Sequence, residues 1–452
     1  MSSSSGAVRM TDGPIWKRMI AFAIPIFWGN LFQQLYNTAD SLIVGRFLGS
    51  EALAAVSSSA NLIYLMVGFF NGVSLGAGVV IARYFGAKDI QNVQKAIHTT
   101  VTLGLFCSVI LSAIGTIAAP HILVLMGTPA DVLPNSIIYF RIYFAGSMGF
   151  VMYNCFVGIL QSVGDSKHPL FYLVVASIVN IVLDVVFIAV LGFGVGAAAL
   201  ATVISQFLSA ILCLIQLLRS PEDFRLYPKK LRIDTRLVRQ VLHNGIPSGV
   251  QNSIISIANV FVQSNINAFG MQAMAGSGAY SKIQGFAFLP VTCFTMALST
   301  FISQNLGAKE YDRAKKGARF GMTCCMIAAE LVGVITIVFA PQLLALFSDD
   351  PTVIAYGVEY SRCNGMFFFL LSLSHCMAAI MRGAGKSTVP MYVMLLTWCL
   401  GRVTYISIAV RFIPKITVVY WAYPITWTLS SIIFLIYYLK SDWVHGLETQ
   451  TV

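Results

Sequence analysis

Part of this chain occurs twice, about 221 residues apart, and this internal repetition constrains the fold more than any other feature. Residues 159–169 (ILQSVGDSKHP) return as residues 380–390 (IMRGAGKSTVP), and Gly-Ala-Lys-Asp at 86–89 returns as Gly-Ala-Lys-Glu at 307–310. Ile24-Pro25 returns as Ile246-Pro247, one residue out of step. Three matches at an almost constant offset indicate two copies of one structural unit.

The composition is that of a membrane protein. Of the 452 residues, 57% are hydrophobic and only 10% are charged, whereas a soluble protein carries roughly 25% charged residues. Most of the outer surface must therefore face lipid. Duplication in so apolar a chain is typical of transporters built from two related halves.

Twelve apolar stretches are long enough to span a bilayer as helices, which needs about 20 residues each. We expect spans at residues 17–44, 53–81, 92–118, 135–160, 168–190, 196–218, 240–267, 274–302, 313–340, 356–382, 389–410 and 416–439. The repeat maps the first six spans onto the last six. The predicted fold is an all-α membrane protein with two pseudo-twofold-related lobes, residues 1–218 and 240–452, joined by a cytoplasmic linker at 219–239.

The charge distribution predicts the orientation. Most of the 29 Lys and Arg residues fall in the tails and in the loops that follow even-numbered spans, and basic loops face the cytoplasm. We therefore expect both termini in the cytoplasm. This placement explains the formal charge of +11 without a nucleic-acid partner.

Two other features exclude further classes of protein. The nine cysteines lie almost entirely within apolar stretches and lack ligand spacing, which indicates small core residues and not disulfides or metal ligands. We expect no cleavable signal peptide, because the first apolar stretch is too long for a signal core.

Four oxygen-bearing side chains are predicted to converge in the first lobe. Asn180 and Asp184 are four residues apart and share one face of span 5. Thr202 lies as far past the short turn at 191–196 as Asp184 lies before it, so the two should be at one depth. Asp40, near the outer end of span 1, should lie at a similar depth.

Carboxylate, amide and hydroxyl oxygens suit a proton or a small hard cation and not zinc or copper. Asp40, Asn180, Asp184 and Thr202 are therefore predicted to form a coupling site for H⁺ or Na⁺, with Na⁺ as the metal ion if sodium is coupled. The second lobe does not repeat this chemistry, because Asp184 maps to Tyr405 and Asn180 to Gly401. Ion coupling is expected in the first lobe alone.

Other polar residues within the spans have structural interpretations. An ion pair between Lys282 and Glu330 is the favoured interpretation of those two charges, Arg402 is expected to pair structurally, and His375 is expected to be a hydrogen-bonded packing residue. Pro25 in span 1 removes a helix hydrogen bond and predicts a kink or hinge, with Pro247 as its counterpart.

A substrate cavity lined by aromatic, methionine and amide side chains is also expected. Such a wall accepts large, flat, cationic or neutral molecules by stacking and cation–π contact. The candidates are Gln33, Gln34, Tyr36, Asn37, Tyr139, Tyr143, Met148, Asn154, Phe288 and Met296.

These features together resemble the multidrug and toxic compound extrusion (MATE) family over essentially the whole chain. The resemblance rests on Pro25 with Asn37-Thr38-Ala39-Asp40 in span 1, on the two Gly-Ala-Lys endings, and on the repeated 161–165 and 382–386 segments. It implies a secondary active antiporter of the plasma membrane, which exports drug-like or toxic organic compounds in exchange for H⁺ or Na⁺ by alternating access.

The resemblance also implies which branch of that family the site belongs to. Asp40 with Asn180, Asp184 and Thr202 is similar to the first-lobe cation site of the damage-inducible-protein-like and archaeal branch. Another branch has coupling acids in spans 7 and 10, where this chain has Asn259, Asn265 and, at the span entry, Glu359.

Two alternatives remain beside the antiporter. A lipid-linked oligosaccharide flippase of the same superfamily is disfavoured by acids in the cavity, since a pyrophosphate needs a cationic one. A membrane enzyme is disfavoured because no zincin motif, nucleophile elbow or Walker A pattern occurs. We expect no enzyme activity and no cofactor beyond the coupling ion, and a monomer in the lipid bilayer with small-molecule substrates.

Overall fold

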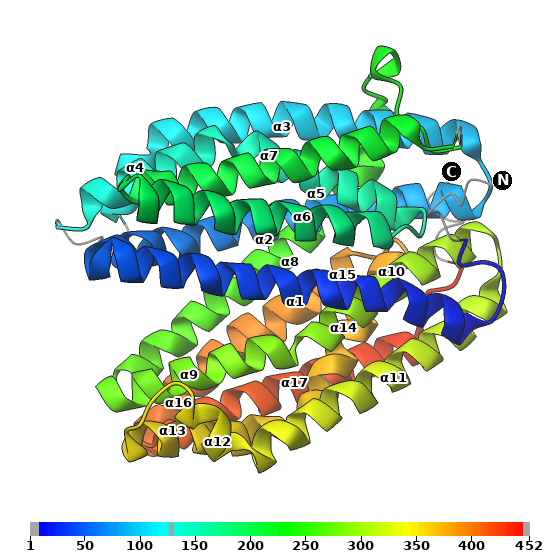
Figure 1. The fold of residues 1–452 in the computed structure, drawn as a ribbon. Helices are drawn as coiled ribbons and strands as arrows, with labels where there is room; N and C mark the ends of the chain where they lie inside the picture. The colour runs from blue at the N-terminus through cyan, green and yellow to red at the C-terminus, as the bar shows by residue number, and fades with distance from the viewer. Residues whose placement is uncertain (1–8, 126–130, 222, 446–452) are drawn as a thin grey trace. The chain divides into compact units, whose positions relative to one another are not determined.

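The structure is a computed structural model that describes residues 9–125, 131–221 and 223–445, apart from the side chain of Leu125 and some side chains between 41 and 65. The described residues form helices joined by short connections, with no strand among them (Figure 1). The predicted cytoplasmic termini, at residues 1–8 and 446–452, lie outside this description.

The chain divides into two compact units. Unit 1 comprises Arg9 with Ile24–Gly245, and unit 2 comprises Met10–Ala23 with residues 246–445. Two of the boundaries between the units lie inside helices. Each falls directly before one of the repeated Ile-Pro pairs, at residues 24–25 and 246–247. Each first helix is therefore divided between the units where its proline removes a backbone hydrogen bond.

The helices of the first half are α1 (Ile15–Phe47), α2 (Gly49–Gly86), α3 (Ile90–Leu125), α4 (Leu133–Ala145), α5 (Ser147–Ser162), α6 (Lys167–Asp184), the π-helical η1 (Val185–Val190) and α7 (Val195–Arg219). A short 3₁₀ turn, η2 (Pro228–Lys230), lies in the connection between the halves.

The helices of the second half are α8 (Thr235–Asn267), α9 (Met271–Ala287), α10 (Leu289–Gly307), α11 (Tyr311–Val338), α12 (Ala340–Ala345), α13 (Pro351–Gly365), α14 (Phe368–Gly383), α15 (Thr388–Met394), the π-helical η3 (Leu395–Gly401), α16 (Arg402–Phe412) and α17 (Ile416–Lys440).

The predicted all-α membrane fold is confirmed. Among the described residues, eight helical segments are long and apolar enough to cross a membrane, and two bent pairs, α4 with α5 and α13 with α14, qualify when each is taken as one span. The remaining two of the twelve predicted spans are α1 and α8. Both have 33 residues, and each carries several basic and amide side chains along its length.

The fourth and tenth spans are broken, which the sequence did not predict. The bends are 47° between α4 and α5 and 55° between α13 and α14. They lie at equivalent positions of the repeat, Gly146 and Phe367. A Cβ atom at Gly146 would lie 2.3 Å from Cγ1 of Val203, so α7 approaches this break too closely for any larger residue.

In unit 2 a side chain stabilises the break. The backbone N–H of Phe369 donates to Oε2 of Glu330 on α11 at 3.0 Å, which satisfies one of the free amides at the start of α14. The predicted ion pair between Glu330 and Lys282 is therefore wrong. Lys282 instead lies with its ammonium 5.9 Å from the ring centre of Phe347.

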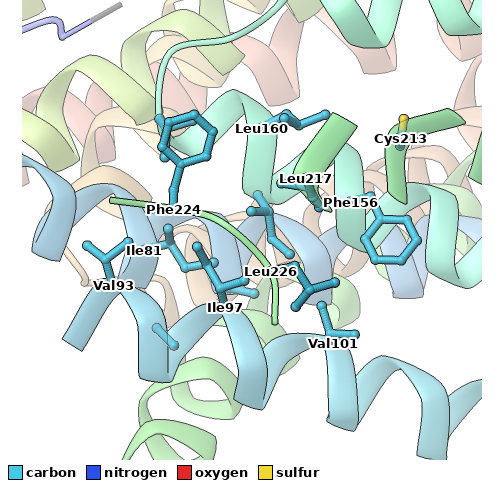
Figure 2. Packing of buried hydrophobic residues seen from close by; sticks show 14 of the residues in the cluster. Ile81, Val93, Ile97, Val101, Phe156, Leu160, Cys213, Leu217, Phe224 and Leu226 are labelled. Atoms are coloured by element: carbon cyan, nitrogen blue, oxygen red, sulfur yellow. The ribbon is translucent and has the colours of Figure 1, made fainter. Parts of the chain in front are cut away.

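Unit 1 has a continuous apolar core that includes part of the connection to the second half. Figure 2 shows side chains of α2, α3, α5 and α7 packed together, with Phe224 and Leu226 among them. Phe224 and Leu226 are each 3% exposed. Burying a Phe or Leu side chain contributes roughly 1.5–3 kcal/mol, so these two residues anchor the connecting segment to unit 1.

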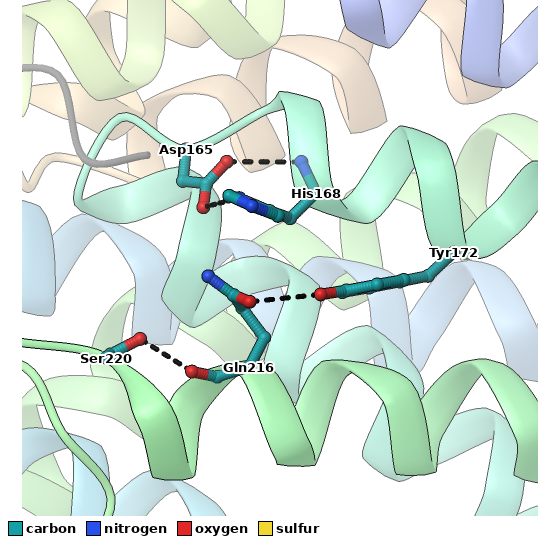
Figure 3. A network of polar contacts seen from close by, with 5 residues as sticks. All are labelled: Asp165, His168, Tyr172, Gln216 and Ser220. Atoms are coloured by element: carbon teal, nitrogen blue, oxygen red, sulfur yellow. Dashed lines mark hydrogen bonds and ion pairs between the residues drawn. The ribbon is translucent and has the colours of Figure 1, made fainter. Parts of the chain in front are cut away.

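Polar contacts hold the repeated segment at 159–169 (Figure 3). Asp165 is 1% exposed, and its carboxylate accepts from Nδ1 of His168 at 2.6 Å and from the backbone N–H of His168 at 3.2 Å. Nearby, the hydroxyl of Tyr172 donates to Oε1 of Gln216 at 3.0 Å. The turn also needs a positive φ at Gly164 (87°), and its counterpart Gly385 has φ 75°.

The Gly-Ala-Lys repeats end two helices in one backbone conformation. Lys88 and Lys309 have φ values of 59° and 61°, and the N–H of the residue after each lysine bonds to the carbonyl five residues earlier, at 3.0 and 2.9 Å. This is the left-handed helix end that glycine usually supplies. A non-glycine residue in this conformation costs about 1 kcal/mol.

We predict opposite effects of two substitutions at Lys309. Lys309→Gly should stabilise the protein by about 1 kcal/mol, because glycine adopts positive φ without strain. Lys309→Val should destabilise it by about 1 kcal/mol or more, because a β-branched residue is a strong outlier there. Thermal unfolding of the purified protein measures both. Lys316→Val, at an exposed site on α11, is the control. Equal stability of the wild type and Lys309→Val would contradict the prediction.

A candidate cation site in unit 1

Two carboxyl groups from different helices of unit 1 meet. Asp40 lies on α1, and Asp184 is the last residue of α6, directly before the π-helical η1. The two carboxyl groups are close enough to interact electrostatically. Two neighbouring carboxylates repel and both only accept hydrogen bonds, so a shared proton or cation would stabilise the pair.

The surroundings leave this pair without ordinary partners. Asp184 is 0% and Asn180 1% exposed. Neither carboxylate oxygen of Asp184 and neither amide atom of Asn180 has a hydrogen-bond donor or acceptor among the described residues. Buried polar groups are almost always hydrogen-bonded. Four such exceptions, the two carboxylate oxygens of Asp184 and the two amide atoms of Asn180, lie on one face of α6, as their spacing of four residues predicts.

Tyrosine and glutamine side chains adjoin the acids. The hydroxyl of Tyr36, one turn before Asp40 on α1, lies within hydrogen-bonding reach of Gln33 and Gln206 and close to both acids. Tyr139 on α4 is buried near both acids, and its ring stacks with that of Tyr143 at a centroid distance of 6.5 Å. Aromatic walls next to two acids suit an organic cation or a flat ring.

Gln206 was missed by the analysis of the sequence. Its Oε1 is buried without a hydrogen-bond partner among the described residues, as are the acceptors of Asp184. Gln206 follows Thr202 by four residues on α7, the same spacing that relates Asn180 and Asp184 on α6. That spacing was the signal that would have found it.

The hydroxyl of Thr202 donates to the carbonyl of Ala198 in its own helix at 3.1 Å, which leaves its oxygen lone pairs for an acceptor role. Among the described residues, no three His, Cys, Asp or Glu side chains gather as metal ligands. A cation held by Asp40 and Asp184 would thus take its further oxygens from amide and hydroxyl groups.

The remaining cavity candidates have local contacts. Thr38 donates to the carbonyl of Gln34 at 2.9 Å, and Asn154 to that of Phe150 at 2.9 Å. Asn37 is exposed. Phe288 and Met296 belong to unit 2, where the ring of Phe288 meets that of His375 edge-on at 4.9 Å.

Two stretches of the chain, residues 25–186 and 247–405, match the model of the MatE family. The chain belongs to the MatE family. One matched stretch lies in each half of the chain, in agreement with the internal repeat. MatE proteins are multi-pass membrane transporters and not enzymes.

Individual relatives of this MatE protein agree in sequence and fold. It is 29% identical to the probable multidrug resistance protein YoeA of Bacillus subtilis, over 83% of each chain. It is 25% identical to the probable multidrug resistance protein NorM of Thermotoga maritima, over 88% of this chain and 86% of that one. An outward-facing multidrug resistance MATE transporter of the MOP superfamily has the same fold, with a TM-score of 0.91, 23% identity and coverage of 99% and 100%.

Because the Asp184 carboxylate has no hydrogen-bond partner among the described residues, we predict that neutralising it stabilises the protein. Asp184→Asn should stabilise the protein by about 1 kcal/mol or more, because it removes repulsion between two buried carboxyl groups. Asp165→Asn is the matched control at an equally buried aspartate, and it should destabilise by about 1–3 kcal/mol through loss of its bonds to His168. Thermal unfolding compares the two. Destabilisation by Asp184→Asn of the same size would contradict the unpartnered site.

Proposed function

We propose that this MatE protein is a secondary active antiporter that exports drug-like or toxic organic compounds, many of them cationic, in exchange for H⁺ or Na⁺. The observation that carries the proposal is the contact between Asp40 and Asp184. A fully buried acid beside a partly buried one is a natural place to bind the coupling ion, because a proton or cation relieves their repulsion. The names of the relatives YoeA and NorM support a drug-like cargo.

In this proposal the ion enters between Asp40 and Asp184, with Asn180 and Thr202 as further oxygen ligands if the ion is Na⁺. The cargo occupies the neighbouring wall formed by Gln33, Gln34, Tyr36, Asn37, Tyr139 and Asn154. Phe288 and Met296 are proposed as cargo contacts in unit 2. Because ion and cargo share one acidic site, binding of one weakens binding of the other, which is the thermodynamic basis of exchange.

Pro25 is the proposed hinge of this cycle. It lies on α1 with Asp40, and it removes the hydrogen bond to the carbonyl of Ala21. Neutralising Asp40 would then change how α1 bends. We place the protein in the plasma membrane as a monomer, with both termini and residues 219–239 in the cytoplasm, because basic loops remain on that side.

Dye efflux from proteoliposomes, driven separately by a pH gradient or a sodium gradient, tests the function. We expect one gradient to drive efflux in the wild type, and Asp40→Asn and Asp184→Asn each to reduce it to background. Drive by pH alone would assign a proton site, and drive by sodium alone a sodium site. Full activity of Asp40→Asn would contradict the proposed coupling site, and drive by neither gradient would favour the flippase.

A substitution at Thr202 distinguishes sodium coupling from proton coupling. Thr202→Val should lower the apparent sodium affinity about tenfold if the site binds Na⁺, because it removes one oxygen ligand. Proton-driven efflux should change little. Thr428→Val is the matched control, since the hydroxyl of Thr428 makes the same bond within its helix, to the carbonyl of Pro424 at 2.7 Å.

A further inference from the structure

Unit 2 contains a fully buried cation that the proposed ion coupling does not use. Arg402 is 0% exposed and begins α16, directly after the π-helical η3. No acidic side chain of the described residues lies within ion-pair distance of it. The expected structural ion pair of Arg402 is therefore absent from the described residues. A buried charge without a counter-ion costs several kcal/mol.

The hydrogen bonds of Arg402 leave part of its guanidinium unused. Nη1 donates to Oδ1 of Asn259 on α8 at 3.2 Å, and Nη2 donates to the hydroxyl of Thr426 on α17 at 3.0 Å. Both acceptors are neutral. Nε is buried and has no acceptor among the described residues. The positive charge is thus positioned from two sides but not neutralised.

Two aromatic rings cover the guanidinium. Its central carbon lies 4.3 Å from the ring centre of Tyr423 and 5.1 Å from that of Trp398. The indole N–H of Trp398 donates to the hydroxyl of Ser430 at 3.0 Å, which fixes that ring. Cation–π contacts of this kind stabilise the cation without removing its charge.

The fifth spans of the two halves thus carry buried charges of opposite sign. In unit 1, Asp184 directly precedes a π-helical turn, and in unit 2, Arg402 directly follows one. By the repeat, Asp184 corresponds to Tyr405, three residues after Arg402 and on the same helix face. Single π turns in helices occur often at functional sites.

We propose that Arg402 binds the anionic group, a carboxylate or a phosphate, of an organic cargo whose ring stacks against Trp398 and Tyr423. The proposal rests on the proposed transport function and extends its cargo to anionic or zwitterionic compounds. A carboxylate or phosphate oxygen accepts more strongly than the neutral oxygens of Asn259 and Thr426. An anion would therefore take Nε and one Nη in the paired geometry that arginine offers.

Arg382, a partly buried arginine of unit 2, serves as the control. Nη1 of Arg382 donates to Oε1 of Gln251 at 3.2 Å, but no aromatic ring covers its guanidinium among the described residues. Both arginines have a buried Nε without an acceptor among the described residues, so that feature does not distinguish the two sites. The rings of Trp398 and Tyr423 beside the guanidinium distinguish Arg402 from Arg382. They predict selectivity for flat anions at Arg402 only.

Binding of three naphthalene probes to the purified full chain in lipid nanodiscs tests the proposal. The probes are 2-naphthoate, 2-naphthyl phosphate and the neutral 2-naphthamide, measured by calorimetry. We expect the wild type to bind at least one anion more tightly than the amide. Arg402→Gln should weaken anion binding at least tenfold and leave amide binding unchanged, whereas Arg382→Gln should change neither. The preferred anion distinguishes carboxylate from phosphate.

Equal binding of anion and amide by the wild type, or unchanged anion binding in Arg402→Gln, overturns the proposal. If Arg402→Gln does not yield monodisperse protein, Arg402→Lys decides, since lysine retains the charge and loses the paired geometry. At least threefold weaker anion binding in Arg402→Lys supports the proposal, and unchanged binding overturns it. Arg402-dependent binding without ion-driven dye efflux would refute the transport function and leave the anion site standing.

Discussion

A charge inside a bilayer needs a partner within the protein, and this constraint determines where the structure can place its few ionisable residues. Glu330 meets it with a backbone N–H at a broken helix. Asp184 and Arg402 meet it least, since both are completely buried without an ion pair among the described residues. At such positions a bound ligand or ion can offset the free-energy cost of the unpaired buried charge. Natural proteins depart from local rules chiefly at functional positions.

The duplicated scaffold makes this asymmetry visible. Both copies have a lysine in the left-handed conformation after Gly-Ala, a glycine of positive φ in the 159–169 and 380–390 segments, and a break in the fourth span of each half. Backbone geometry is thus repeated to the level of single turns. The charge chemistry is not repeated, since the fifth span holds an acid in one half and an arginine in the other. A duplicated fold can therefore give its two halves different chemistry by changing a few side chains at equivalent depth.

Much of the fold could be predicted because hydropathy reflects the bilayer directly. The predicted spans agree with the helices to within several residues at each end, α1 and α8 included, and the repeat relates these two helices to one another. Part of the candidate site was also predictable, because helical periodicity places Asn180 and Asp184 on one face of α6 and the short turn after η1 sets the expected depth of Thr202. The bends at Gly146 and Phe367 and the two π turns were not predicted. Each bend has a contact from far away in the sequence, with Val203 of α7 at Gly146 and with the carboxylate of Glu330 at Phe369.

The sequence by itself determined the class of protein, the duplication, the spans and the identity of the membrane acids, because these follow from composition and from local periodicity. Only the tertiary structure decided which polar groups meet. It brought Asp40 to Asp184, added Gln206 and Tyr36, separated Lys282 from Glu330, and enclosed Arg402 between Trp398 and Tyr423. The physical reason is that side-chain partners depend on the rotation and bending of whole helices, which packing between distant segments sets and hydropathy does not record.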